Sequence, residues 1–147
     1  MIHSDVSARP VLLIEDSADD VVLTLRALRQ HGVLNEVQVA SDGAEAVRLL
    51  FGEGEPVPCL ILLDLKLPKV SGLDLLSQIR ANPRTRYTPV VVLTSSLQQA
   101  DIIASYAKGA NAYVRKPVEF AEFVEAISVI GLFWLLINEN PATSSSQ

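Results

Sequence analysis

The chain has 147 residues, of which 49% are hydrophobic and 20% are charged. This composition predicts a folded domain with a substantial core and excludes a disordered chain. The net charge of −5 argues against broad nucleic-acid binding, which needs a basic face. The longest apolar run, Val129 to Ile137, is too short to span a membrane. The N-terminus lacks an apolar signal core and Cys59 is the only cysteine, which favours a cytoplasmic protein without a disulfide.

Short apolar runs alternate with helical patterns along the chain. The run Val11 to Ile14 predicts a buried strand, and the helix after it is expected to begin at Ser17, with Asp20 as its capping-box partner. That helix is expected to stop before Gly32. The alternation then recurs, with strands predicted around residues 37–39, 59–63, 89–94 and 111–114 and helices over 42–51, 72–80, 98–109 and 119–130.

Buried strands that alternate with helices predict an α/β fold with a parallel sheet covered by helices on both faces. Right-handed crossovers favour a flavodoxin-like, doubly wound, five-stranded sheet of order 2-1-3-4-5. We expect this domain to span residues 10–138, between a tail at 1–9 and a disordered tail at 139–147.

Polar residues follow four of the five predicted strands. Glu15 and Asp16 follow the first strand, Asp64 ends the third, Thr94 ends the fourth, and Lys116 follows the fifth. The carboxyl ends of parallel strands meet at one edge of the sheet, where ligands bind. Each residue alone has an ordinary explanation, such as a helix cap or a surface charge. Their meeting at one edge makes a functional site the better interpretation.

Three carboxylates at one edge raise each other's pKa unless a cation lies among them. Carboxylate oxygens with open coordination positions suit Mg²⁺, which also binds phosphate oxygens. A lysine and a hydroxyl nearby can hold those phosphate oxygens. A carboxylate such as Asp64 can act as a nucleophile and form an acyl phosphate. The sequence therefore predicts Mg²⁺-dependent phosphoryl transfer to Asp64.

These residues lie in motifs that together resemble the receiver domain of two-component response regulators. The motifs are LLIEDSADD, LILLDLKLPKVSG, VVVLTSS and YVRKP, and the resemblance covers about Val11 to Ile130. Pro68 and Gly72 also match the family's loop after the phosphoacceptor. The resemblance implies a signalling module that takes a phosphoryl group from a histidine kinase and signals through its fourth helix, fifth strand and fifth helix.

The resemblance also implies roles at the site. Glu15, Asp16 and Asp64 would hold Mg²⁺, and Asp64 would be phosphorylated. The remaining implied roles are phosphoryl contacts for Thr94 and Lys116, an inward turn of Tyr113 when Thr94 moves, and a cis peptide bond between Lys116 and Pro117.

Lys66 departs from the family pattern, which often has asparagine or another small or polar residue two positions after the phosphoacceptor. The resemblance implies that the backbone carbonyl of this residue ligates the metal, and any side chain leaves that carbonyl in place. The Lys66 side chain has two interpretations: it shields an acyl phosphate from water, or it is a solvent-facing loop charge.

The C-terminal stretch ISVIGLFWLLINENP resembles the single-domain regulators that serve phytochrome-type histidine kinases, and we expect no output domain after it. One face of the last helix is expected to face the core through Phe120, Val124, Ile127, Gly131 and Trp134. The apolar residues left over predict a homodimer, with the chain folding back on its own core as the alternative. These residues are Val129, Leu132, Phe133, Leu136 and Ile137.

Three other functions compete with the signalling module. A small Mg²⁺-dependent phosphohydrolase with an aspartyl nucleophile usually needs a second acid where Lys66 stands. A binding module that uses the fold without phosphorylation would be expected to have a broken acid set, and this one is intact. A flavin-binding domain would need a glycine- and hydroxyl-rich loop after the first strand, where EDSADD is acidic.

Overall fold

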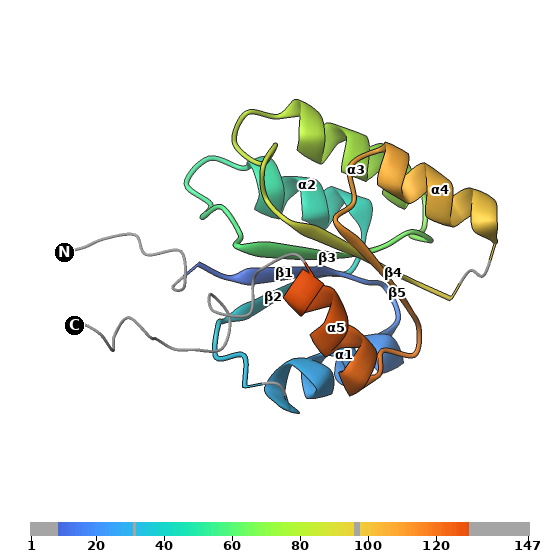
Figure 1. Cartoon of the computed structure of the whole chain (residues 1–147). Coiled ribbons are helices and arrows are strands. Elements are labelled where there is room, and N and C mark those ends of the chain that lie inside the picture. The colour runs from blue at the N-terminus through green and yellow to red at the C-terminus, as the bar shows by residue number, and fades with distance from the viewer. Residues whose placement is uncertain (1–8, 31, 96–97, 130–147) are drawn as a thin grey trace.

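The computed structural model describes residues 9–30, 32–95 and 98–129. Five strands and five helices alternate along these residues, as predicted (Figure 1). The strands are β1 (Val11–Ile14), β2 (Val37–Ala40), β3 (Leu60–Asp64), β4 (Val90–Thr94) and β5 (Ala112–Arg115). The helices are α1 (Ala18–Gln30), α2 (Gly43–Phe51), α3 (Gly72–Ala81), α4 (Gln99–Ala107) and α5 (Phe120–Val129). None of these described helices is long and apolar enough to cross a membrane.

The sheet has the order β2-β1-β3-β4-β5, and every neighbouring pair is parallel, which confirms the predicted topology. Helices α1 and α5 cover one face of the sheet, and α2, α3 and α4 lie on the other (Figure 1). The fold is therefore doubly wound, with all five strand ends at one edge.

The core has two halves, one on each side of the sheet. Alternate residues of β1 supply them: Val11 and Leu13 face the side of α1 and α5, and Leu12 and Ile14 face the other side. Each of these four side chains is at most 1% exposed. Burial on both faces explains why the strands are continuous apolar runs in the sequence.

The predicted core face of the last helix is wrong for Val124, which is partly exposed. Among the α5 side chains that the structure describes, Phe123 and Ala126 are buried, and both join the core half that contains Ala27 and Leu28 of α1. Packing against α1 therefore selects a neighbouring face of a helix that is apolar on several sides.

The predicted dimer residues Leu132, Phe133, Leu136 and Ile137 lie outside the described residues, as do Gly131 and Trp134. Val129 ends α5, and its side chain is also outside the description. The predicted domain boundaries at 9–10 and 138–139 and the disordered tail stay predictions.

Candidate functional site

The register of the sheet brings the predicted site residues to one edge. Ile14 of β1 pairs with Leu63 of β3, so the next residues along the two strands, Glu15 and Asp64, lie side by side. Asp64 in turn pairs with Leu93, directly before Thr94. The Lys116 backbone N–H donates to the Thr94 carbonyl at 2.8 Å, which fixes the chain just beyond β5.

Asp64 is a buried carboxylate, only 3% exposed, at the end of β3. Its Oδ1 accepts a hydrogen bond from the Lys66 backbone N–H at 3.1 Å, and its Oδ2 lies 3.4 Å from Lys116 Nζ. Gly72 keeps the following loop close, because a Cβ at this position would lie 2.6 Å from the Asp64 carbonyl oxygen. The loop thus returns to the strand end and holds the Asp64 carboxylate in a defined position.

Glu15, Asp16 and Asp64 form the predicted acidic cluster. Each offers a carboxylate oxygen, and the three oxygens lie within 4.8 Å of one another. Glu15 is 1% exposed, whereas Asp16 is exposed to solvent. Burial, together with a smaller contribution from the Asp64 charge, raises the pKa of Glu15 to about 7 against the opposing effect of its Lys116 hydrogen bonds. The three residues fit a hard divalent cation, which would relieve this repulsion.

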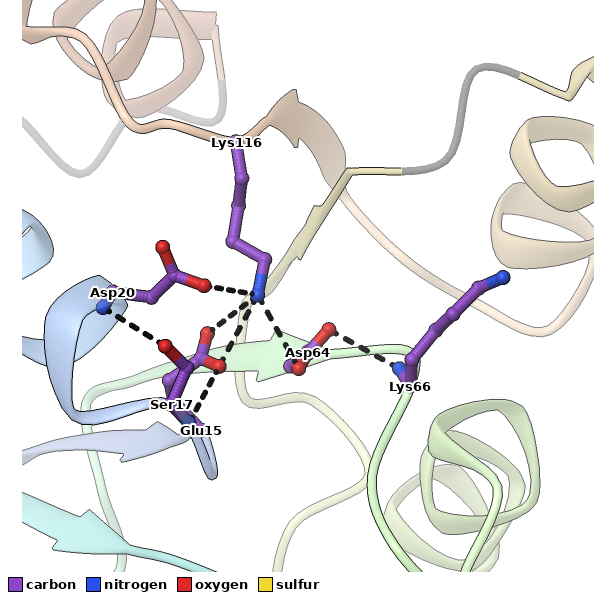
Figure 2. A network of polar contacts seen from close by, with 6 residues as sticks. All are labelled: Glu15, Ser17, Asp20, Asp64, Lys66 and Lys116. Atoms are coloured by element: carbon purple, nitrogen blue, oxygen red, sulfur yellow. Dashed lines mark hydrogen bonds and ion pairs between the residues drawn. The ribbon is translucent and has the colours of Figure 1, made fainter.

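Lys116 is the cation at the centre of the site. Its Nζ lies 3.0 and 3.1 Å from the two Glu15 carboxylate oxygens, 2.9 Å from Asp20 Oδ2 and 3.4 Å from Asp64 Oδ2 (Figure 2). Burial lowers the pKa of Lys116, but the hydrogen bonds to Asp20 and Glu15 outweigh it and raise that pKa. The ammonium is therefore charged and lies beside the Asp64 carboxylate.

Asp20 is the residue of this site that the sequence interpretation missed. The Ser17 hydroxyl accepts the Asp20 N–H at 3.2 Å, which confirms Ser17 as a cap. The other half of the predicted capping box is wrong, because Glu15 accepts the Ser17 N–H at 3.2 Å and the Asp20 carboxylate binds Lys116 instead (Figure 2).

Thr94 and Tyr113 lie on the side of the site that leads to α4 and α5. Thr94 is fully buried at the end of β4, and Tyr113 is half-buried in β5. Tyr113 also lines a surface cavity of about 390 Å³ that runs between α4, β5 and α5 and includes Tyr106, Glu122 and Glu125. The peptide bond between Lys116 and Pro117 is cis, which confirms that prediction.

The Lys66 side chain is exposed and extends away from the Asp64 carboxylate (Figure 2). Only its backbone N–H contacts Asp64. In this arrangement the ammonium of Lys66 does not cover the phosphoacceptor position, so shielding from water would require the side chain to swing inward. The shielding role and the metal-binding role of the Lys66 carbonyl both stay predictions.

A buried acceptor carboxylate, an acidic cation site and a charged lysine at the strand ends define a module for phosphoryl transfer. Residues 11–128 match the model of the response regulator receiver domain, and the chain belongs to this family. It is therefore a phosphoryl-accepting response regulator of the two-component type, as the motifs predicted.

Among solved structures, the chain is similar to the bacteriophytochrome response regulator RtBRR, with 50% identity and a TM-score of 0.79 over 92% of this chain and 86% of that one. It is 39% identical to response regulator Rcp1 of Synechocystis, over 90% of this chain and 94% of Rcp1. A structure of the Mn²⁺-bound form of Rcp1 aligns with a TM-score of 0.72 and 37% identity over 86% of this chain and 94% of that one. The probable methanogenesis regulatory protein FilR2 of Methanothrix harundinacea is 37% identical, over 89% of this chain and 86% of FilR2.

Proposed function

We propose that Asp64 is the phosphoacceptor of this response regulator. The observation that carries the proposal is the contact set of its buried carboxylate: a backbone N–H on Oδ1 and the Lys116 ammonium near Oδ2. An Asp64 oxygen attacks the phosphorus of a phosphohistidine or a small acyl phosphate, the bond from phosphorus to the donor breaks, and an acyl phosphate forms on Asp64. Lys116 would neutralise charge on the transferred oxygens, and the Thr94 hydroxyl would donate a hydrogen bond to one of them.

The experiment is incubation of the wild-type chain with acetyl phosphate and Mg²⁺, followed by intact-mass measurement and peptide mapping. We expect one base-labile phosphoryl group, mapped to Asp64. A phosphoryl group on a serine or threonine would contradict the assignment. A generic phosphate ester serves as a second substrate, and repeated turnover of it would favour the phosphohydrolase alternative over a regulator that is not an enzyme.

The metal that fits this site is Mg²⁺, held by carboxylate oxygens of Glu15, Asp16 and Asp64 and by the Lys66 backbone carbonyl. The support is the spacing of the three carboxylates and the Mn²⁺-bound form of the related Rcp1. The bound cation would supply positive charge for the oxygens of the transferred phosphoryl group.

Replacing Asp16 with alanine is expected to weaken Mg²⁺ binding by at least roughly tenfold, because it removes one of three charged ligands. Asp16 is the exposed member of the cluster, so its loss leaves the core intact. Isothermal titration with Mg²⁺ measures the affinity, and Asp19→Ala, an exposed acid in the first turn of α1, is the control. Equal Mg²⁺ affinity in the two variants would show that the metal site is assigned wrongly.

The output of phosphorylation is proposed to be a change at the surface of α4, β5 and α5. Thr94 would move toward the phosphoryl group and Tyr113 would turn inward behind it. The cavity beside Tyr113 lies on this surface, so movement of its ring would change the shape that a partner meets.

The phosphoryl donor is proposed to be a phytochrome-type histidine kinase, in the cytoplasm, where a lone thiol such as Cys59 stays reduced. The support is the 50% identity to RtBRR and the similarity to Rcp1 over most of both chains. Transfer from a purified bacteriophytochrome kinase tests this proposal. Transfer no faster than from an unrelated histidine kinase would point to a different signal.

A homodimer through the C-terminal apolar segment is also proposed, with phosphorylation adjusting its affinity. Burying one aromatic or branched side chain contributes roughly 1.5–3 kcal/mol, and a two-fold axis uses each residue twice. Sedimentation at micromolar concentration is expected to show a dimer for the wild type and a smaller species for Phe133→Glu combined with Leu136→Glu. A wild-type monomer in both phosphorylation states would favour folding back of the segment instead.

A further inference from the structure

Glu15 is shared between two possible partners, the Lys116 ammonium and a divalent cation. Both of its oxygens contact Lys116 Nζ, at 3.0 and 3.1 Å. The same carboxylate belongs to the cluster of three that fits a divalent cation. If Glu15 turns one oxygen to a bound metal ion, it keeps only one of its two contacts with Lys116.

Asp20 is not shared in this way. Its Oδ2 lies 2.9 Å from Lys116 Nζ, the shortest of the ammonium's carboxylate contacts. Asp20 is not among the three carboxylates grouped around the cation position. It reaches the ammonium from α1, on the opposite side from Asp64 (Figure 2). Asp20 thus contacts only the Lys116 ammonium of the site's two positive partners, whereas Glu15 contacts Lys116 and also belongs to the group that fits the metal ion.

We propose that Asp20 is a positioning residue that holds Lys116 beside Asp64 when Glu15 turns toward the metal. The inference rests on the proposed phosphorylation of Asp64. Lys116 has four rotatable side-chain bonds, so without a fixed partner its ammonium samples positions away from the acceptor. A charge-assisted hydrogen bond from a neighbouring helix restricts that sampling and keeps the ammonium where the phosphoryl oxygens arrive.

Asp19 provides a matched control within the same helix turn. Both aspartates lie in the first turn of α1, where a negative charge interacts favourably with the helix dipole. Asp19 is exposed, whereas Asp20 is partly buried and bound to Lys116. Comparison of Asp20→Asn with Asp19→Asn therefore removes the effects of net charge and helix stability.

The test measures two quantities on each full-length variant: the Mg²⁺ dissociation constant and the phosphorylation rate constant with acetyl phosphate at saturating Mg²⁺. We expect Asp20→Asn to lower the rate constant roughly tenfold, because misplacing a catalytic group by a small distance is enough for such a loss. Its Mg²⁺ affinity is expected to stay within about threefold of Asp19→Asn, since Asp20 is not a ligand. Asp20→Glu, which keeps the charge, is expected to recover part of the rate.

Each result distinguishes this inference from the proposed function. Failure of the wild type to become phosphorylated on Asp64 would overturn both. A normal wild type with Asp20→Asn as fast as Asp19→Asn would overturn only the role of Asp20. Loss of Mg²⁺ binding in Asp20→Asn, to the level of Asp16→Ala, would show that Asp20 acts on the metal and not through Lys116.

A second readout does not depend on the folding of a variant. A crystal structure of the wild-type chain with Mg²⁺ and beryllofluoride, which mimics the phosphoryl group, is expected to retain the contact between Asp20 and Lys116 while Glu15 faces the metal. An Asp20 carboxylate turned to solvent in that structure would refute the proposal.

Discussion

Replacement of Asp64 with asparagine is expected to abolish phosphorylation and to stabilise the unphosphorylated protein. The amide is a poor nucleophile, so no acyl phosphate forms with acetyl phosphate and Mg²⁺. The stability effect follows from the charges. Asp64 is repelled by two carboxylates whose ligand oxygens lie within 4.8 Å, and it is attracted by one ammonium at 3.4 Å. If the same dielectric constant applies to all three pairs, the summed repulsion of Asp64 by Glu15 and Asp16 is larger than its attraction to Lys116.

With an effective dielectric constant of about 20 and allowance for the exposure of Asp16, this difference is about 1–2 kcal/mol. Urea unfolding in EDTA at about pH 8.5, where Glu15 with its pKa of about 7 is ionised, measures this difference, with Asp19→Asn as the control for lost charge. Intact mass gives the phosphorylation result on the same samples. A phosphorylated Asp64→Asn protein would remove Asp64 as the sole acceptor, and a destabilised one would show that the Lys116 contact outweighs the repulsion.

The removal of Asp64 also has a pH signature. Burial and the Asp64 charge raise the pKa of Glu15 to about 7 from its ordinary 4.5. The folded state therefore binds more protons than the unfolded state between these values, and the Glu15 contribution to stability falls as pH rises from about 4.5 to 7. Without the Asp64 charge the pKa of Glu15 moves back toward 4.5. The metal-free Asp64→Asn variant should lose less stability over this range than the wild type.

The fold and most of the site follow from local patterns in the sequence. The strands are buried on both faces, so they appear as continuous apolar runs, and parallel strands bring their carboxyl ends to one edge whatever the detailed packing. Glu15, Asp64, Thr94 and Lys116 could therefore be assigned to one site from the sequence alone. The sheet register adds the order in which these residues meet across the edge.

What the sequence did not predict depends on contacts between distant segments. Asp20 stands three residues after Ser17, which is also the spacing of a capping box, and its true partner Lys116 is 96 residues away. The last helix is apolar on several sides, so periodicity does not choose between Val124 and Phe123. Contact with α1 makes that choice. In both cases the local pattern permits two arrangements and a tertiary contact selects one.

Arg80 is a third residue whose role is tertiary. It lies in α3, and its guanidinium donates to the Gly109 carbonyl at 2.8 and 3.0 Å, to the Thr88 carbonyl at 2.7 Å and to Asn111 Oδ1 at 2.9 Å. Asn111 Oδ1 also accepts the Val90 N–H, at the start of β4. One side chain thus joins α3 to the segments that lead into β4 and β5, at the opposite end of these strands from Thr94 and Lys116.

Arg80→Met is expected to destabilise the fold by about 2–4 kcal/mol, because it keeps the apolar stem but leaves several partly buried acceptors without their donor. Burial already lowers the pKa of this guanidinium, so its hydrogen bonds offset a desolvation cost. Arg26→Met is the matched control: Arg26 is an exposed arginine within α1, and arginine and methionine have similar helix propensities. Urea unfolding should show a lower midpoint with an unchanged slope for Arg80→Met alone.

The phosphorylation rate of the folded Arg80→Met protein separates stability from function. The Lys116 N–H is bonded directly to the Thr94 carbonyl at the site end of the sheet, so the acceptor geometry does not depend on Arg80. We therefore expect a rate within about twofold of the wild type under conditions where the variant is folded, since distant sites without shared partners act independently. A large loss of rate with little loss of stability would show instead that Arg80 sets the position of β5, and with it the position of Lys116.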